Sequence, residues 1–208
     1  MAMYDPVYLE RARALCTRYR VHLIADEIMT GFGRTGTLFA CEQPGIAPDF
    51  LCLSKGITGG YLPLSVVLTS DVIYHAFYDD DVAKGFLHSH SYTGNALACR
   101  AALAVLDLFR DEPILAANRD RAARLDRLAM PLERHPKVRD FRHLGMIWAF
   151  EVETSRSDFA GWFVAEALQR ELLLRPIGHT VYWMPPYCLD DAELELLADR
   201  TLSIVECA

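Results

Sequence analysis

Two short apolar segments, each followed by a single residue with useful chemistry, constrain the fold of this chain most strongly. Residues 21–25 (VHLIA) lead directly into Asp26, and residues 50–54 (FLCLS) lead directly into Lys55. Short and nearly continuous apolar runs are typical of strands in a parallel sheet that is covered on both faces. We therefore predict an α/β fold in which Asp26 and Lys55 follow neighbouring strands at the carboxyl edge of a sheet, where ligands bind.

The remaining pattern predicts two domains. Asp5-Pro6 is an N-terminal helix signal, and a proline-containing break follows Asp111. We place the domain boundary there, giving domains 1–111 and 112–208, the second being a small α+β domain. The elements expected are helices over 6–19, 96–109 (packed in the interior), 114–132 and 159–172, strands over 65–68 and 181–184, two strands within 138–152 joined near Gly145, and a last helix opened by a capping box of Asp190 and Glu193.

Composition excludes several classes of function. The chain has 21 Lys and Arg against 28 Asp and Glu, a net charge of −7, which argues against a nucleic-acid partner. The longest apolar run covers residues 101–106, far below the ~18 residues of a membrane span. Six scattered cysteines without a CxxC pair favour a reduced, cytoplasmic protein.

Two motifs suggest functions that the surrounding sequence does not support. Residues 31–36 (GFGRTG) match GxGxxG, but residues 37–48 contain two prolines and a glycine and show no helical period. A dinucleotide site needs a helix directly after the glycines, so we expect a tight irregular loop instead. His88 and His90 form an HxH pair without a third ligand nearby, and we expect no metal site.

Asp26 and Lys55 together indicate a pyridoxal phosphate site. Each has a simpler interpretation, a turn or cap for Asp26 and an exposed surface side chain for Lys55. Lys55 is, however, one of only three lysines, and glycines at 56, 59 and 60 allow a ligand to approach closely. A carboxylate can hold the cationic ring nitrogen of this cofactor while a lysine amine holds its aldehyde carbon.

Two further segments carry candidate anion-binding groups. Residues 89–95 (SHSYTGN) precede the helix expected from residue 96, and hydroxyls and amides there suit a phosphate. Simple capping by Thr93 or Asn95 is the alternative, and both interpretations can hold. Arg175 can clamp a substrate carboxylate with two parallel hydrogen bonds, or it can form a structural ion pair.

Taken together, these residues resemble the class III aminotransferases, which are fold type I pyridoxal phosphate enzymes, from end to end of the chain. A second set of segments narrows the resemblance to the branch of this class that acts in biotin biosynthesis. The segments of the first set are LIADEI (23–28), TGFGRTG (30–36), LSKG (53–56) and HSHSYTGNALAC (88–99), and those of the second are SKGITGGYLPLS (54–65), LRP (174–176) and YWMPPY (182–187).

The resemblance assigns residues to the cofactor. It implies that Lys55 is the catalytic lysine that binds pyridoxal 5′-phosphate and that Asp26 pairs with the pyridine nitrogen. Ser91, with His90 beside it, takes the place of the residue that reaches the phosphate of the neighbouring subunit's cofactor. A homodimer with shared active sites is therefore implied, and the fold implied is the C-terminal part of a cofactor-binding large domain followed by a small C-terminal domain.

The resemblance also implies a substrate and its contacts. Besides Lys55, Arg175 matches the carboxylate-binding arginine, and Ser89 matches a position near the substrate where the family usually has glycine. A backbone conformation specific to glycine would be strained by a side chain at Ser89. The reaction implied is transamination of 8-amino-7-oxononanoate to 7,8-diaminononanoate, with S-adenosylmethionine or another amine such as lysine as donor.

Three interpretations of the chain's function stay open at this point. The family has a long segment before Asp5-Pro6 that includes a glycine-rich phosphate loop and a stacking aromatic residue, so we expect the chain to be truncated and to bind cofactor weakly. Another class III aminotransferase, acting on an ω-amino acid, fits the same motifs. An inactive fragment or dimerisation remnant would also keep them by descent.

Overall fold

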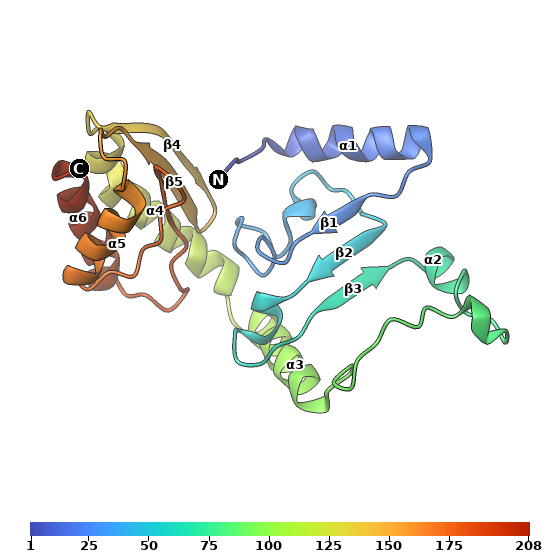
Figure 1. The fold of residues 1–208 in the computed structure, drawn as a ribbon. Coiled ribbons are helices and arrows are strands. Elements are labelled where there is room, and N and C mark those ends of the chain that lie inside the picture. Colours follow the sequence, from blue (N-terminus) through green and yellow to red (C-terminus); the bar gives the residue numbers. More distant parts are fainter. The chain divides into compact units, whose positions relative to one another are not determined.

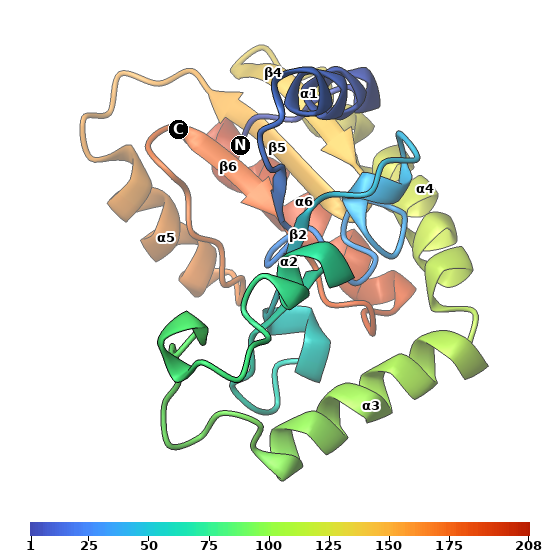
Figure 2. The same ribbon diagram turned by 90° about the vertical axis from the view of Figure 1, so that its right-hand side faces the viewer.

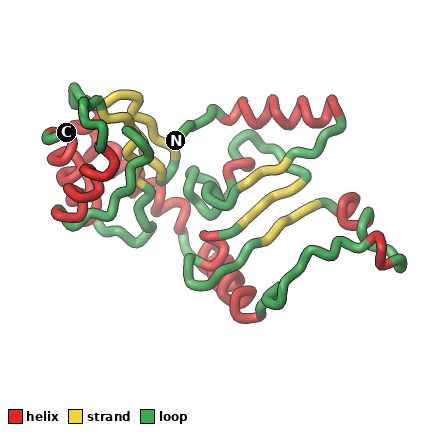
Figure 3. Tube along the Cα trace, viewed as in Figure 1, coloured by secondary structure: helices red, strands yellow, loops and turns green.

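The computed structural model describes all of residues 1–208, and the chain divides into two compact units. The N-terminal unit comprises Tyr4–Pro113, and the C-terminal unit comprises Ile114–Ala208 together with Met1–Met3. Each unit has its own three-stranded sheet, visible as two separate groups of yellow strands in Figure 3. The mixture of helices and strands is that of an α/β protein (Figure 1).

The N-terminal unit begins with helix α1 (Pro6–Tyr19). Asp5 caps this helix as predicted, since its carboxylate accepts a hydrogen bond from the amide of Val7 at 2.9 Å. The sheet contains strands β1 (Ile24–Asp26), β2 (Phe50–Leu53) and β3 (Val66–Thr69). The other elements are the short helices η1 (Ala40–Glu42), η2 (Lys55–Thr58), α2 (Asp71–His75) and η3 (Val82–Lys84) and the long helix α3 (Ala96–Asp111).

The order of the sheet is β1-β2-β3, with β1 parallel to β2 and β3 antiparallel to it. Strand β1 begins later than the apolar run over 21–25, because the amide of Leu23 donates to the Asp49 carboxylate at 2.7 Å instead of joining the ladder. The strand predicted over 65–68 lies one residue further on. Helix α3 packs against η2, which follows β2 directly.

Burial in this unit is lower than the sequence pattern predicts. The apolar run over 21–25 is predicted to be covered on both faces, yet Ile24 in this run is 61% exposed. Helix α3 was expected in the interior, yet only Ala98 and Ala102 are buried on it, and Leu97 is 73% exposed. These two expectations are wrong for residues 1–208, because an apolar pattern says what an element can bury and not whether a covering partner is present.

The C-terminal unit contains helix α4 (Ile114–Glu133) and a hairpin. Strands β4 (Val138–Leu144) and β5 (Ile147–Val152) are joined at Gly145, which has a φ of 60°, as the glycine at that point predicted. Helix α5 (Phe159–Gln169) ends before the predicted residue 172, since Glu171 has a left-handed φ of 57°. Strand β6 (Thr180–Trp183) and helix α6 (Asp191–Glu206) complete the unit.

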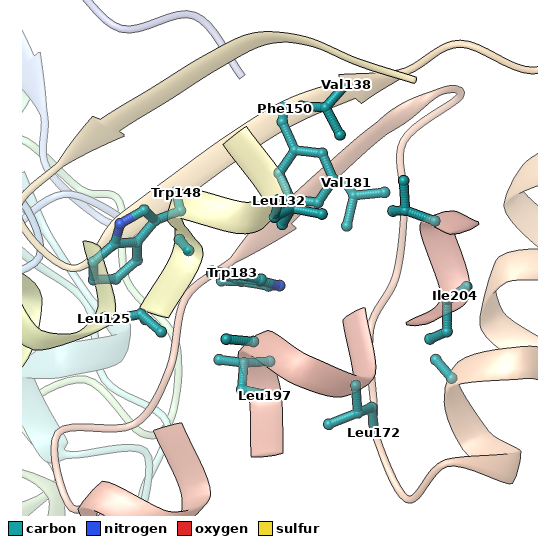
Figure 4. Close-up of a cluster of buried hydrophobic side chains, with 14 of the residues drawn as sticks. Leu125, Leu132, Val138, Trp148, Phe150, Leu172, Val181, Trp183, Leu197 and Ile204 are labelled. Atoms are coloured by element: carbon teal, nitrogen blue, oxygen red, sulfur yellow. The ribbon is translucent and has the colours of Figure 1, made fainter. Parts of the chain in front are cut away.

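The sheet of the C-terminal unit is antiparallel, in the order β4-β5-β6. Helices α4 and α6 pack against each other on one side of this sheet, and Figure 2 shows the strands in front of α6. Asp190 and Glu193 form the predicted capping box, with both hydrogen bonds at 2.9 Å. Figure 4 shows the core between sheet and helices, which is lined by Leu125, Leu132, Val138, Trp148, Phe150, Leu172, Val181, Trp183, Leu197 and Ile204.

None of the helices combines the length and the apolar content that crossing a bilayer requires.

Candidate active site

The structure brings Asp26 and Lys55 to the same edge of the N-terminal sheet. Asp26 is the last residue of β1 and is paired in register with Cys52 on β2. Lys55 follows the end of β2 by two residues. Because β1 and β2 are parallel, their carboxyl ends meet at one edge, so the carboxylate and the amine belong to the same rim of the sheet.

The Asp26 carboxylate is available for a ligand. One of its oxygens accepts a hydrogen bond from the amide of Ile28 at 3.1 Å, which closes a short turn after the strand. The side chain is exposed, and no cation of the chain pairs with it. A carboxylate that a backbone amide orients in this way can still accept a hydrogen bond from a protonated ring nitrogen.

Lys55 has a strained backbone. Its φ of 47° lies in the left-handed region, which costs a residue with a side chain roughly 1–3 kcal/mol. Two hydroxyl groups hold the surrounding turn: Ser54 donates to the Leu64 carbonyl at 2.7 Å, and Thr58 donates to the Leu62 carbonyl at 2.6 Å. Strain of this kind persists where the surroundings impose the conformation, which is frequent at ligand sites.

The amine of Lys55 differs from those of the other two lysines. Lys84 pairs with the Asp79 carboxylate at 2.6 Å, and Lys137 donates to the backbone carbonyls of Glu206 and Ala208 at 2.9 and 2.5 Å. Lys55 is exposed and has no hydrogen bond or ion pair within the chain. It is therefore the lysine that is free to react with a carbonyl compound.

Sequence reasoning missed Glu27, which directly follows Asp26. Its side chain is buried, and its carboxylate accepts hydrogen bonds from the amides of Ala40 and Cys41 at 2.7 and 2.8 Å and from the hydroxyl of Thr30 at 3.1 Å. Burial, with a further contribution from Glu27, raises the pKa of the Cys41 thiol to about 12. Glu27 therefore ties the two ends of the loop over residues 27–41 together.

The loop that Glu27 closes contains the GxGxxG match. Gly33 and Gly36 have φ angles of 91° and 98°, and the amide of Gly36 donates to the Gly33 carbonyl at 3.1 Å. Only the three-residue helix η1 follows. The prediction of a tight irregular loop over these residues is confirmed.

Ser89, His90 and Ser91 lie in an exposed loop of the same unit, between η3 and α3. The amide of His90 donates to the Thr93 hydroxyl at 3.0 Å, and its Nδ1 accepts from the amide of Tyr92 at 3.1 Å. Ser89 does not adopt a left-handed φ, so its side chain causes no strain here. No strand covers residues 85–95, so the regular alternation of a strand does not hold His88 and His90 on one side.

Asn95 caps helix α3. Its side-chain oxygen accepts hydrogen bonds from the amides of Leu97 and Ala98 at 2.9 and 3.2 Å. The capping interpretation of residues 89–95 is thus confirmed for Asn95. Thr93 stabilises the preceding turn through His90 instead.

Arg175 belongs to the C-terminal unit. It lies in the segment between α5 and β6, is exposed, and has no carboxylate within salt-bridge distance. Its guanidinium group is available to a ligand.

Comparisons with known proteins give one consistent result. The family model described as aminotransferase class III matches residues 1–205. The chain is 48% identical to the adenosylmethionine-8-amino-7-oxononanoate aminotransferase of Helicobacter pylori, over 99% of this chain and 49% of that protein. It is 44% identical to the protein of the same name from Nitratidesulfovibrio vulgaris, over 91% of this chain and 37% of that protein.

Solved structures agree with these relatives. The adenosylmethionine-8-amino-7-oxononanoate aminotransferase of Methanocaldococcus jannaschii matches with a TM-score of 0.91 and 34% identity, over 100% of this chain and 51% of that one. An amine transaminase from an uncultivated Pseudomonas species, solved in its PLP-bound (internal aldimine) form, matches with a TM-score of 0.87 and 33% identity, over 97% and 48%. The chain thus spans about half the length of the curated relatives it matches.

Proposed function

The chain belongs to the class III aminotransferase family and has the corresponding part of a fold type I transferase, and from this premise we propose that it carries the catalytic-lysine half of a pyridoxal phosphate-dependent aminotransferase. The observation that carries the proposal is the position of Asp26 and Lys55 after neighbouring parallel strands. An unpaired primary amine and an exposed carboxylate at one sheet edge are the donor set that this cofactor requires.

Each of the two residues has a defined chemical role. Bound pyridoxal phosphate supplies an electron sink that makes a proton on the adjacent substrate carbon labile. The Asp26 carboxylate accepts a hydrogen bond from the ring nitrogen and keeps that nitrogen protonated. The Lys55 amine would hold the cofactor's aldehyde carbon and, as a free amine, would move the proton between the substrate carbon and C4′.

Four further assignments belong to the same proposal. His90 and Ser91 bind the phosphate of the neighbouring subunit's cofactor, so the active form is a homodimer. Ser89 lies near the substrate, and Arg175 binds its carboxylate with two parallel hydrogen bonds. Residues 1–111 are the C-terminal part of the cofactor-binding domain, and residues 112–208 are the small domain.

We propose 8-amino-7-oxononanoate as the amino acceptor, which the reaction converts to 7,8-diaminononanoate in biotin biosynthesis. The names of the relatives from two bacteria support this substrate. The proposed donor is S-adenosylmethionine, which those names include. A second candidate is an ω-amino acid, because an (S)-enantioselective omega-transaminase from Thermomicrobium roseum matches with a TM-score of 0.88 and 31% identity.

The three lysines make a sharp test of the cofactor site. The 208-residue chain is incubated with pyridoxal phosphate, its absorbance spectrum is recorded, borohydride fixes any adduct, and peptide mass spectrometry gives the labelled fraction of each lysine. We expect Lys55 to be labelled in preference to Lys84 and Lys137, and the absorbance band to be lost in Lys55→Ala. Asp26→Asn is expected to reduce labelling of Lys55 while leaving that of Lys84 unchanged.

Equal labelling of all three lysines would refute the cofactor assignment of Lys55. The substrate assignment is tested separately. Transamination by the dimer is assayed with 8-amino-7-oxononanoate and with a panel of ω-amino acids, and the Arg175→Ala variant serves as the control.

A further inference from the structure

Gly56, the residue after Lys55, is enclosed by a single aromatic side chain. A β-carbon placed on Gly56 would lie 2.9 Å from both Cβ and Cδ2 of Phe32 and 3.0 Å from its Cγ. Gly56 does not have a left-handed φ, so its backbone conformation alone would accept a side chain. The position therefore needs glycine because of Phe32, which lies directly against the backbone that carries Lys55.

Phe32 is packed too closely by its neighbours to move away from Gly56. It is 4% exposed, and its ring lies 5.7 Å from that of Phe39 and 6.2 Å from that of Phe109. Its own φ of 58° is left-handed, a conformation that costs energy and that the enclosing loop must impose. Glu27 closes that loop through the amides of Ala40 and Cys41.

The contact connects the two halves of the candidate site. The loop that carries Phe32 starts directly after Asp26, and Gly56 directly follows Lys55. Packing of Phe32 on Gly56 thus ties the segment after the carboxylate to the segment after the amine. This tie adds to the single strand pairing of β1 with β2, which extends only to Asp26 and Cys52.

We propose that Phe32 is a positioning residue that holds the strained backbone of Lys55, and thereby aims its amine, by packing against Gly56. The inference rests on the proposed cofactor role of Lys55 for its functional meaning. Its structural part states that the backbone at Lys55 and Gly56 is held in a closed turn, and this can be measured without any cofactor.

Three variants test the contact. Gly56→Ala introduces the clash, and Phe32→Gly removes all three clashing atoms while suiting the left-handed φ. Alanine at position 32 would keep one of the clashing atoms, the β-carbon. The third variant combines both changes. The matched control is Leu51→Ala, which removes a side chain of the same small core from strand β2.

The first readout is cleavage by endoproteinase Lys-C, which cuts after lysine and has only three sites in this chain. We expect cleavage after Lys55, relative to cleavage after Lys84, to become about tenfold faster in Phe32→Gly, because the population of the open turn rises. Leu51→Ala is expected to lower the melting temperature without changing this ratio. Rates measured on the urea-unfolded variants correct for sequence preference.

The second readout is the labelled fraction of Lys55 with pyridoxal phosphate and borohydride. We expect Gly56→Ala to lower the preference for Lys55 and the double variant to recover part of it, together with part of the melting temperature if Gly56→Ala folds poorly. Unchanged cleavage and labelling ratios in Phe32→Gly would overturn the inference. Equal labelling of all lysines with altered cleavage would refute only the proposed function.

Discussion

The two units of this chain differ sharply in how completely they bury their apolar surface. The core of the C-terminal unit contains twenty buried side chains, among them both tryptophans of its sheet, whereas that of the N-terminal unit contains four. All but four of the exposed large hydrophobic side chains belong to the N-terminal unit. The unit that contains Asp26 and Lys55 is therefore the one whose apolar side chains are largely exposed.

The cover that each sheet receives explains the difference. In the C-terminal unit, α4 and α6 supply cover from the same stretch of chain, and four consecutive residues of the central strand β5 (147–150) are buried. The parallel pair of β1 and β2 belongs to a class of sheet that is normally covered on both faces. Helix α1 has no buried residue, and α3 buries only two, so neither provides that cover.

The comparison teaches that local order at a site does not depend on a large core. Around Asp26 and Lys55, the loops are fixed by hydrogen bonds that the Glu27 carboxylate accepts and that the hydroxyls of Ser54 and Thr58 donate. These bonds connect residues close in sequence and need no distant covering element. The site's local geometry and the stability of the unit that carries it are thus determined by different interactions.

The largest effect is expected from truncating the core of the C-terminal unit. Phe150 is fully buried and meets Trp183 edge to face at 6.0 Å. Phe150→Ala should lower the free energy of unfolding by about 3–5 kcal/mol through lost burial and a cavity. All three tryptophans, Trp148, Trp162 and Trp183, lie in the C-terminal unit, so urea unfolding followed by tryptophan fluorescence measures this unit alone.

Leu68→Ala is the matched change in the N-terminal unit. Leu68 is a strand residue that is 49% exposed, and its truncation should change stability by less than about 1 kcal/mol. Hydrogen exchange in peptides of strands β2 and β3 measures that unit. If both substitutions destabilised their own units equally, the contrast in burial would have no energetic meaning.

An intermediate effect is expected where the N-terminal unit does bury a charge. Glu27→Gln leaves one of the amides of Ala40 and Cys41 facing an NH₂ group, which should cost about 1–3 kcal/mol. Because Cys41 is buried and its pKa is raised to about 12, its thiol should alkylate at pH 8 far more slowly than the exposed thiol of Cys99. Alkylation of Cys41 should become faster in Glu27→Gln, whereas that of Cys99 should not change.

The same thiol gives a pH dependence with a definite sign. The folded pKa of Cys41 is about 12 against an ordinary value of 9.0, so between these values the folded unit keeps a proton that the unfolded chain has lost. The contribution of this group to stability is complete below pH 9.0 and is lost as the pH rises toward 12. Cys41→Ser should flatten this alkaline loss, measured by hydrogen exchange of the loop over 27–41.

The sequence predicted the elements of the C-terminal unit well for a physical reason. The hairpin at Gly145 and the capping box of Asp190 and Glu193 are local signals, and each has its partner within a few residues. The burial of Ile24 and Leu97 was predicted wrongly, since it depends on partners remote in sequence. Apolar periodicity cannot say whether such partners exist.

The candidate site was predictable only in part. Asp26 and Lys55 could be found because a strand precedes each of them, and the parallel pairing of β1 with β2 then follows. Glu27 and Phe32 could not, since a buried carboxylate and a left-handed aromatic residue look in sequence like an exposed turn. The one available signal was their place in the sequence, since Glu27 directly follows Asp26 and Phe32 lies within the glycine-rich residues 31–36.

The smallest effect compares two N-terminal caps with the same chemistry. Asp190 accepts a hydrogen bond from the Glu193 amide at 2.9 Å at the start of α6, and Asp5 accepts one from the Val7 amide at 2.9 Å at the start of α1. Asp190→Ala should lower the unfolding free energy of the C-terminal unit by about 1 kcal/mol, because α6 buries one face in its core. Asp5→Ala should fray only the first turn of α1, which buries nothing, and should leave the unfolding of the N-terminal unit unchanged. Hydrogen exchange of the two first turns, beside urea unfolding of each unit, separates fraying from global loss. A global loss in Asp5→Ala equal to that in Asp190→Ala would mean that α1 is coupled to its unit more strongly than its exposed surface indicates.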